Sequence, residues 1–506
     1  MKKLFAAMLL AASVALMGST AKAAAKPGLS SAVINGNQIV ITASAAVTSA
    51  DGVLHLKSQA PYMTGAQGTD VQQMPSGTAS FVIPLGKDTA ASNLFNKFVV
   101  TDSAGNVLTN SVYIANPEVS ATHTAARRDG GIKGILPASQ LLGQNNLTDL
   151  GIKQITYNLL LGRICSGGGI NYTYNGKTYS FSSRYVSEYD IVAQLMNKRG
   201  IQVTYIILND LGGDPNLISP LAAGAASNYY GLNASNEAGV EKLEAVASFL
   251  GQRYGNTGHG TVDNWIVGNE VNAWSQWNYM NAGSLSNFAN EYAKAFRILY
   301  NGIRSENANA RIYVGTDQQW AVASSAAYYG SRPFLEAFNN IVKAEGNIDW
   351  RVAMHAYNVP LYSVNNWSAT GYAVHNQNSR YVTMQNIDVL TDFLSQPSML
   401  SPSGQVRTVK LSEQGFTSTT GEPAQAAAVT FGYMQAASNK YVDGFILSRE
   451  MDDPGEIAQG LAVGLLDTTG RHKLAYEYYK HAGEPAYFTQ ASALAGTNLA
   501  AGIVAR

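Results

Sequence analysis

The sequence contains a single cysteine, Cys165, among its 506 residues. One thiol cannot form a disulfide within the chain, and it excludes zinc sites built from several cysteines and iron–sulfur clusters held by cysteines. No histidine lies near Cys165 in the sequence, so we interpret it as an inert thiol and not as a nucleophile. The fold must therefore be stabilised by packing.

Charged residues are also scarce, because they make up 13% of the chain against about 25% in an average soluble domain. The 34 basic residues balance the 34 acidic ones, so the chain has no basic excess for binding nucleic-acid phosphates. Apolar residues make up 46%, which excludes an intrinsically disordered chain. No glycine-rich nucleotide motif follows an apolar strand. We expect no nucleic-acid partner and no cofactor.

No apolar run is long enough to cross a bilayer, which takes about 20 residues. An apolar run over residues 4–17 follows two lysines and precedes the small-residue pattern Ala21-Lys22-Ala23. This arrangement is typical of a secretory signal peptide. We predict a Sec-type signal peptide over residues 1–23, and hence a secreted or periplasmic bacterial protein that does not bind a membrane. A buried N-terminal helix is the alternative.

Tryptophan is absent from the first part of the chain, since all six tryptophans lie between Trp265 and Trp367. Over residues 27–118, short segments alternate between apolar and polar residues and are separated by turns such as Asn-Gly and Asp-Gly. This pattern predicts a small antiparallel β-sandwich. Such modules on secreted enzymes can bind glycans, but the lack of Trp favours a supporting role.

After His123 the pattern changes to apolar strands separated by helical segments, which indicates βα units and a parallel sheet. Eight candidate strands start at Ile132, Lys153, Ile201, Val262, Arg311, Asp349, Thr408 and Val442. Each interval leaves room for a loop and an amphipathic helix. We predict an α/β fold in which a (β/α)8 TIM barrel over residues 125–485 follows the β-sandwich and precedes a C-terminal tail over residues 486–506.

Two glutamates close strands of the predicted barrel. The fourth strand ends in Asn269-Glu270 and the seventh in Glu413. Active sites of such barrels lie where the strands end, so carboxylates from opposite parts of the sheet can converge there. A carboxylate pair suits glycosidic bond cleavage, which needs a proton for the leaving oxygen and a negative group to meet the positive charge that develops on the sugar.

Other strands also end in polar residues. His355 and Tyr357 follow the sixth strand two residues apart, so they point the same way. The third strand ends in Asn209 and the eighth in Arg449. Arg449 can bind a sugar carboxylate or pair with a neighbouring acidic residue. A purely structural role remains the alternative for each of these side chains.

Long loops follow strands two, three, four and six, and we expect them on the face where the substrate binds. Their Tyr, Trp, Asn and Ser residues combine flat apolar surfaces for sugar rings with neutral hydrogen-bonding groups. Trp274 and Trp320 are candidate sugar platforms, as is Trp277. Packing within the loops is the alternative role for each of them.

These motifs resemble the superfamily of retaining (β/α)8 glycoside hydrolases that carry catalytic glutamates on strands four and seven. Asn269-Glu270, Glu413 and His355-x-Tyr357 carry the resemblance, which covers about residues 125–480. More closely, the chain is similar to a group of secreted bacterial proteins described only as a domain of unknown function. This second resemblance implies no substrate.

The superfamily resemblance implies a role for each matching residue. Glu270 would be the general acid/base, and Glu413 would be the nucleophile. Asn269 would donate to the sugar 2-hydroxyl, and Tyr357 would hydrogen-bond to Glu413. His355 would orient the surroundings of the nucleophile or bind a hydroxyl. After strand eight, where members often carry a Trp beneath the sugar, this sequence has Phe, Ser and Arg instead.

We therefore predict a secreted glycoside hydrolase that cleaves a polysaccharide or oligosaccharide by a retaining two-glutamate mechanism. A barrel that binds glycans without catalysis is the main alternative. A metal-dependent hydrolase that uses His355, Glu413, Asp452 and Asp453 is a third, but the seven histidines include no HxH or HExxH pattern. We expect a carbohydrate substrate and no metal, and the oligomeric state stays open.

Overall fold

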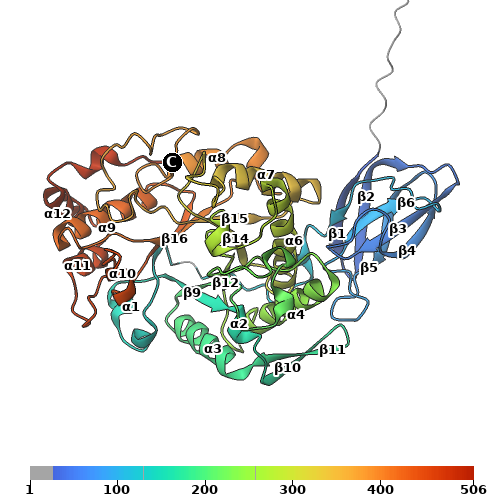
Figure 1. Ribbon diagram of the computed structural model, residues 1–506, viewed down its shortest axis with the longest axis horizontal. Coiled ribbons are helices and arrows are strands. Elements are labelled where there is room, and N and C mark those ends of the chain that lie inside the picture. Colours follow the sequence, from blue (N-terminus) through green and yellow to red (C-terminus); the bar gives the residue numbers. More distant parts are fainter. Residues whose placement is uncertain (1–26, 129, 257) are drawn as a thin grey trace, which may run out of the picture.

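The structure is a computed structural model that describes residues 27–128, 130–256 and 258–506. It consists of a small β unit beside a large barrel with surrounding helices (Figure 1). The predicted signal peptide over residues 1–23 lies outside the described residues. No helix in the described ranges is long and apolar enough to cross a membrane.

The N-terminal unit has two antiparallel sheets, with the strand orders β1-β2-β5 and β4-β3-β6-β7. Its strands are β1 (Leu29–Asn35), β2 (Gln38–Val47), β3 (Val53–Gln59), β4 (Thr69–Pro75), β5 (Thr78–Pro84), β6 (Lys97–Thr101) and β7 (Val112–Tyr113). Ile39, Ile41 and Phe81 from the first sheet are buried in one cluster with Leu56 and Phe98 from the second. The alternating pattern of the sequence thus placed one face of each sheet in a shared core, as predicted.

Eight parallel strands close into a barrel in the order β12-β13-β14-β15-β16-β17-β8-β9. They are β8 (Lys133–Ile135), β9 (Gln154–Leu160), β12 (Gln202–Leu208), β13 (Asn264–Val267), β14 (Arg311–Thr316), β15 (Trp350–Met354), β16 (Val409–Gln414) and β17 (Val442–Leu447). All eight candidate strands are present. They could be recognised in the sequence because strands of such a barrel are buried on both faces and appear as continuous apolar runs. The predicted (β/α)8 barrel preceded by a small antiparallel β unit is confirmed.

Helices surround the barrel and bury their apolar faces against it. The longer ones are α3 (Ser183–Lys198), α4 (Glu237–Tyr254), α6 (Leu285–Arg304), α7 (Ser331–Ala344), α8 (Asp388–Leu394), α9 (Glu422–Ala437), α11 (Leu474–Lys480) and α12 (Pro485–Ala495). Short ones are α1 (Asn146–Asp149), α2 (Leu161–Ile164), α5 (Trp274–Trp277) and α10 (Pro454–Ile457). Asn236 and Ser284 begin α4 and α6 by accepting hydrogen bonds from backbone N–H groups in the first turn.

The N-terminal unit docks on the outer, helical side of the barrel. Lys87 pairs with Glu306 just beyond α6 at 3.0 Å. Asn301 of α6 donates to the carbonyl oxygen of Leu94 at 2.9 Å. These contacts hold the unit beside the barrel and not over the ends of its strands.

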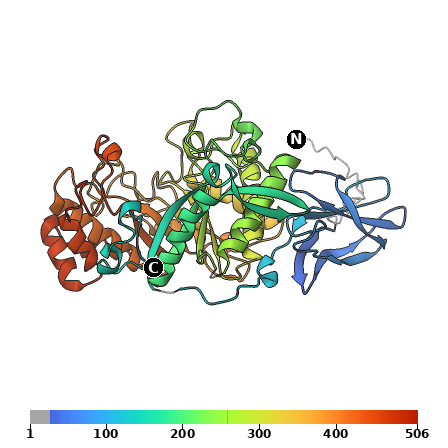
Figure 2. The same cartoon turned by 90° about the horizontal axis from the view of Figure 1, so that it is seen from below.

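The loop after β9 carries a two-stranded hairpin. Its strands are β10 (Gly169–Tyr174) and β11 (Lys177–Ser182). Phe181 stacks on Phe249 of α4 with ring centroids 3.9 Å apart, and the Tyr174 ring lies edge-on to that of Phe95 of the N-terminal unit, with centroids 6.2 Å apart. Figure 2 shows the teal hairpin running toward the blue N-terminal unit. We expected this loop to lie on the substrate face, but its rings instead cover α4 and join the two units.

A buried ion network fills the barrel where its strands begin. Asp443 accepts hydrogen bonds from Arg311 at 2.9 Å and from the Tyr313 hydroxyl at 2.8 Å. Lys410 lies 3.4 Å from the other oxygen of Asp443, and burial lowers the pKa of this lysine to about 8. These side chains occupy this end of the barrel, so the opposite end, where the strands finish, is the one that can receive a ligand.

The C-terminal segment packs on the barrel domain. Helix α12 lies against α9, and Ala491 and Leu499 are buried. Arg506 pairs with Asp388 and Asp392 of α8 at 3.2 Å and 2.7 Å. The segment beyond the predicted boundary at residue 485 is therefore attached to the barrel domain by these two buried residues and by the ion pairs of Arg506.

Candidate active site

Glu270 follows β13 in a tight bend, and Glu413 lies within β16 near the end of that strand. Glu270 has a φ of 40°, which is in the left-handed region that residues with a side chain rarely adopt. The Glu270 side chain is 17% exposed and that of Glu413 is 31% exposed. Both carboxylates therefore lie at the open end of the barrel and remain in contact with solvent.

His355 follows β15, and one of its ring nitrogens approaches both glutamates. Its Nδ1 atom is 2.8 Å from Oε1 of Glu270 and 3.8 Å from Oε2 of Glu413. Two atoms at these distances from a third atom can be at most 6.6 Å apart, which is the sum of the two distances. The structure thus brings these three predicted residues into one site, although they come from three different strands.

His355 carries a positive charge at neutral pH. Its side chain is only 3% exposed, and this burial acts to lower its pKa. The charge of Glu413, the hydrogen bond to Glu270 and the charge of Glu270 outweigh burial and raise the pKa to about 9. The imidazolium therefore donates its Nδ1–H to Glu270 and offsets part of the negative charge of the two glutamates.

Tyr357 holds the other oxygen of Glu413. Its hydroxyl donates to Oε1 of Glu413 at 2.7 Å. Burial and the charge of Glu413 raise the pKa of Tyr357 well above its ordinary value, so the phenol stays protonated. Gly415 permits this approach, because a Cβ at this position would lie 3.0 Å from Cε1 of Tyr357. The hydrogen bond from Tyr357 to Glu413 that the resemblance implied is therefore present.

A third carboxylate, Asp317, belongs to the same site and was missed in the sequence. It follows β14 and is 3% exposed. Burial and the charge of Glu270 raise its pKa to about 7, although Asn272 and Gln319 donate hydrogen bonds to it. Asp317 could have been found in the sequence by the search for polar residues at the ends of apolar strands, which led to Glu270. It directly follows the fifth barrel strand.

Two residues that we predicted to bind sugar are buried in the protein interior. Asn209 is 5% exposed, and its amide donates to the carbonyl oxygens of Leu217 at 2.9 Å and Gly231 at 3.2 Å. Trp320 is fully buried and packs edge-on against Phe393, with ring centroids 5.3 Å apart. The structure contradicts sugar contacts by either residue, because Asn209 ties down the loop after β12 and Trp320 has no open face.

Asn269 and Trp274 lie at the site and are half-buried. Asn269 directly precedes Glu270 in the bend after β13. The indole N–H of Trp274 donates to the carbonyl oxygen of Ala326 at 3.2 Å, and its ring lies 6.2 Å from that of Tyr329. Trp274 therefore joins the loops after β13 and β14 and leaves only part of its ring exposed.

Further half-buried aromatic side chains lie on the loops around the glutamates. Trp277 lies against Tyr229, with ring centroids 5.8 Å apart. The pKa of Tyr229 is raised by burial and by the negative charges of Asp210 and Glu413. The pKa of Tyr328 is raised by burial and by the negative charges of Asp317 and Glu270. Trp277 was a candidate platform in the sequence. Tyr229 and Tyr328 were missed, because they lie far from the glutamates along the chain and in loops of no regular pattern.

Arg449 follows β17 and is held by acidic neighbours. One of its nitrogens pairs with Glu456, and the other lies 3.6 Å from Asp453. The guanidinium lines a cavity of about 430 Å³ at the ends of β8, β9 and β17, together with Arg163 and Glu188. Pairing with neighbouring acids, one of its two predicted roles, is therefore present in the structure, and its side chain remains 30% exposed beside this cavity.

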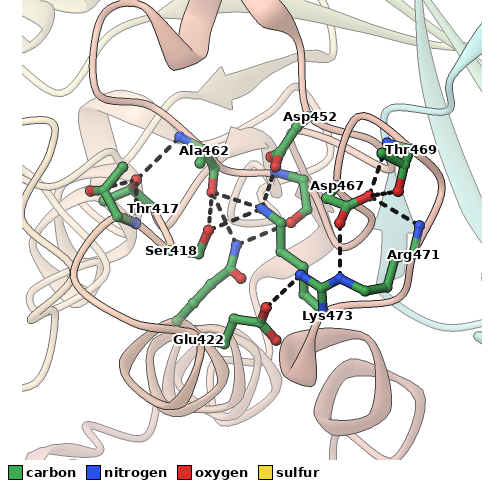
Figure 3. Close-up of polar contacts among 12 residues, drawn as sticks. Thr417, Ser418, Glu422, Asp452, Ala462, Asp467, Thr469, Arg471 and Lys473 are labelled. Carbon is green, nitrogen blue, oxygen red and sulfur yellow. Dashed lines mark hydrogen bonds and ion pairs between the residues drawn. The ribbon is translucent and has the colours of Figure 1, made fainter.

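The loops after β16 and β17 are joined by a buried network around Lys473 (Figure 3). The Lys473 ammonium lies 2.6 Å from Asp452, and both side chains are almost fully buried. It also donates to the Ser418 hydroxyl at 3.0 Å and to the carbonyl oxygen of Ala462 at 3.2 Å. This network fixes the segment that directly follows the strand of Glu413.

The same contacts argue against a metal site at the end of the eighth barrel strand. The other oxygen of Asp452 accepts from the Gly464 N–H at 2.7 Å, so both its oxygens are engaged. Asp453 accepts from the Gly455 and Glu456 N–H groups at the start of α10. Over the described ranges, no group of three or more histidine, cysteine or acidic side chains is arranged to hold a metal ion.

Cys165 is buried, and burial raises the pKa of its thiol to about 12. A thiol with so high a pKa carries almost no thiolate at neutral pH. This agrees with the interpretation of Cys165 as an inert side chain.

Several solved structures of glycoside hydrolases are similar to this chain. A family 39 glycoside hydrolase from the gut symbiont Bacteroides cellulosilyticus WH2 is 15% identical with a TM-score of 0.48, over 91% of this chain and 83% of that one. The exo-β-1,4-mannosidase Op5Man5 from Opitutaceae bacterium strain TAV5 is 14% identical with a TM-score of 0.42, over 72% and 63%. The β-glycosidase from the hyperthermophile Thermosphaera aggregans is 13% identical with a TM-score of 0.46, over 70% and 88%.

Likenesses this distant carry no argument about activity. No curated protein matches the sequence. The family DUF5722, described as a family of unknown function, matches residues 125–501, which span the barrel and the packed C-terminal segment. This match confirms the resemblance to a family of unknown function that the sequence suggested. The chain belongs to the family of unknown function DUF5722.

Proposed function

We propose that this protein is a glycoside hydrolase that cleaves an oligosaccharide or polysaccharide with retention of configuration. Glu270 is the general acid/base and Glu413 is the nucleophile. The observation that carries the proposal is the approach of both carboxylates to the same Nδ1 atom of His355, which places one oxygen of each at most 6.6 Å apart. Retaining glycosidases have carboxyl groups about 5 to 5.5 Å apart, whereas inverting ones need about 6.5 to 9.5 Å.

In the first step, Glu413 attacks the anomeric carbon while Glu270 gives its proton to the leaving oxygen. The bond between sugar and leaving group breaks, and the sugar becomes an ester of Glu413. In the second step, the ionised Glu270 takes a proton from water, whose oxygen attacks the same carbon and releases Glu413. Two inversions at one carbon give overall retention.

The surroundings of each carboxyl group suit these roles. His355 donates to Oε1 of Glu270, so the acidic proton is directed to Oε2, the oxygen that His355 leaves free. Tyr357 donates to Oε1 of Glu413, which fixes this carboxyl group and leaves Oε2 for attack. Asn269 extends the site toward the sugar 2-hydroxyl, a contact that strengthens in the transition state of such reactions.

A panel of polysaccharides and aryl glycosides tests the proposal, with products read by reducing ends and mass. We expect turnover of at least one member, and Glu413→Gln should abolish it while leaving binding of the same glycan largely intact. Binding without turnover by the unmutated protein would contradict the proposal and favour the alternative of a non-catalytic glycan-binding barrel. Matched binding of both proteins shows that the substitution left the site folded.

Glu270→Ala tests the acid/base role of Glu270 separately from the nucleophilic role of Glu413. It should slow glycosides with poor leaving groups far more than 2,4-dinitrophenyl glycosides, because the latter need no proton. Azide should then restore turnover and yield a glycosyl azide, since this anion occupies the space of the missing base. Equal loss on all substrates without rescue would contradict the role given to Glu270.

We propose further that the protein is exported by a Sec-type signal peptide over residues 1–23. The supporting pattern is two lysines, an apolar run and the sequence Ala21-Lys22-Ala23. Expression of the full chain in a Gram-negative host should give a periplasmic protein whose N-terminal residue is Ala24. An uncut chain in the cytoplasm would contradict export.

A further inference from the structure

The bend that carries Glu270 is strained and needs outside support. The Glu270 φ of 40° places a residue with a side chain in the left-handed region, and Gly268, two residues earlier, has a φ of 77°. Such conformations persist only where surrounding contacts enforce them. The contacts that hold this bend therefore also determine where the proposed acid/base lies.

Two kinds of contact join the bend to the neighbouring strand β14. The Val271 N–H donates to the carbonyl oxygen of Gly315 at 2.9 Å. Gly315 lies so close that a Cβ there would be 2.9 Å from the carbonyl oxygen of Gly268 and 3.6 Å from the nitrogen of Glu270. Backbone contact alone thus fixes the bend on one side.

Side chains also join the bend to the end of β14. The Asn272 amide donates to Oδ1 of Asp317, and the Asp317 N–H donates back to the Asn272 side-chain oxygen at 2.9 Å. Asn272 is fully buried and is also bonded to the backbone of Tyr329, with its side-chain nitrogen 3.1 Å from the carbonyl oxygen. Asn272 lies two residues after Glu270, so this reciprocal pair joins the bend directly to the end of β14.

Asp317 is itself held rigidly. Its two oxygens accept from the Gln319 N–H at 3.0 Å and from the Gln319 side-chain amide at 2.9 Å. Among the described residues, no lysine or arginine pairs with Asp317, and the nearby groups that titrate are Glu270, His355 and Tyr328. A buried carboxylate without a cation in contact is costly to maintain, which indicates that it serves a purpose beyond packing.

We propose that Asp317 is a positioning residue that, through Asn272, holds Glu270 in its left-handed bend with its carboxyl group at the leaving oxygen. The proposal rests on the proposed function, because positioning has meaning only if Glu270 transfers a proton. It goes beyond the two-glutamate mechanism, because Asp317 touches neither the sugar nor the reacting atoms.

The test compares Asp317→Ala, which removes the oxygen that accepts from the Asn272 amide, with the unmutated protein on phenyl and 2,4-dinitrophenyl glycosides of the sugar that the panel identifies. A misplaced acid should lower kcat on the phenyl glycoside by about 10- to 100-fold, with KM little changed. Turnover of the dinitrophenyl glycoside, which needs no proton, should fall less than about threefold. Equal loss on both substrates, or no loss on either, would overturn the proposal.

Two further variants separate positioning from general loss of stability. In Asn272→Asp, two carboxylates face each other, and we expect the same selective loss. The double variant Asn272→Asp with Asp317→Asn exchanges donor and acceptor, and should recover part of the phenyl glycoside rate. Asp388→Asn also removes a buried charge, on α8 and far from this bend along the chain. It should lower Tm without changing the ratio of the two rates.

If the unmutated protein cleaves no glycoside, the proposed function fails and the positioning claim is judged on structure alone. Crystal structures of Asn272→Asp and of the unmutated protein then decide it. We expect Glu270 to leave the left-handed region in the variant. An unchanged φ at Glu270 would show that the backbone contacts suffice and would overturn the role of Asp317.

Discussion

His355 and Glu270 are joined by a hydrogen bond, with Nδ1 of the buried imidazolium 2.8 Å from Oε1 of the Glu270 carboxyl group. The pair joins the ends of β15 and β13, which are two strands apart around the barrel. Because Oε2 of Glu413 lies 3.8 Å from the same Nδ1 atom, this one side chain limits the distance between the two carboxyl groups that we propose as catalytic. The first prediction concerns this charge.

His355→Gln should change how stability depends on pH. The pKa of His355 is raised from 6.5 to about 9, so the folded state holds this proton more tightly than the unfolded state. Its contribution to the free energy of unfolding is fully present below pH 6.5 and is lost as the pH rises through about 9. Urea unfolding at about pH 6 and about pH 10 should show a difference between variant and unmutated protein that shrinks by roughly 3 kcal/mol at the higher pH.

A variant whose unfolding free energy runs parallel to that of the unmutated protein across this pH range would contradict the charge assigned to His355.

Tyr357→Phe should lower activity more than stability. The substitution removes the hydroxyl that donates to Glu413 and keeps the ring. Hydrogen bonds to charged groups contribute about 1.5 to 3 kcal/mol, so we expect kcat to fall by about 10- to 100-fold. Steady-state kinetics on the substrate found in the panel measure this.

Tyr254→Phe is the matched control for Tyr357. It also removes a buried hydroxyl that donates to a carboxylate, at 3.0 Å from Asp190, but between α4 and α3. It should lower Tm and leave kcat near its original value. Similar losses of kcat in both variants would show that Tyr357 acts through stability alone.

Trp277→Ala should weaken binding of oligosaccharides. Trp277 and Tyr229 form a half-buried aromatic pair on the loops beside the glutamates. Loss of one aromatic contact of about 1.5 kcal/mol raises KM roughly tenfold. Trp320→Phe is the control, because Trp320 is buried and should affect Tm but not KM. An unchanged KM for Trp277→Ala would exclude it as a sugar platform.

Lys473→Met should destabilise the protein strongly. It leaves Asp452 buried without its ion-pair partner, which costs about 3 to 5 kcal/mol of the free energy of unfolding. Arg471→Ala removes an ion pair drawn in the same view (Figure 3), but the Arg471 side chain is 58% exposed. Screened surface pairs contribute about 1 kcal/mol or less. Equal destabilisation by both variants in urea unfolding would contradict the account of this network.

The sequence was sufficient to predict the barrel because burial on both faces leaves a distinct signature in every strand. The rule that polar residues at strand ends meet at one end of the barrel held for Glu270, Glu413, His355 and Tyr357, which the structure brings together. The rule failed for Asn209, because whether a side chain beyond the strand turns to the pocket or into a loop depends on contacts with residues far along the chain.

Other features could not be predicted for similar reasons. Trp320 is the type of residue that forms a sugar platform, but only the packed structure shows that its ring is fully buried. Asp317 obeys the strand-end rule, yet its bond to Asn272 depends on the register of two neighbouring strands. The sequence likewise did not indicate that the hairpin β10–β11 reaches the N-terminal unit, because both sides of that contact are ordinary aromatic residues.

The most direct test of the central claim is covalent trapping of the nucleophile. A 2-deoxy-2-fluoro glycoside with an activated leaving group forms the glycosyl ester but hydrolyses slowly, because fluorine destabilises the positive charge that develops in both steps. Mass spectrometry of the digested protein should then find one sugar on the peptide that carries Glu413, and none in Glu413→Gln. A sugar attached elsewhere, or no adduct on a protein that turns over the parent glycoside, would contradict the account.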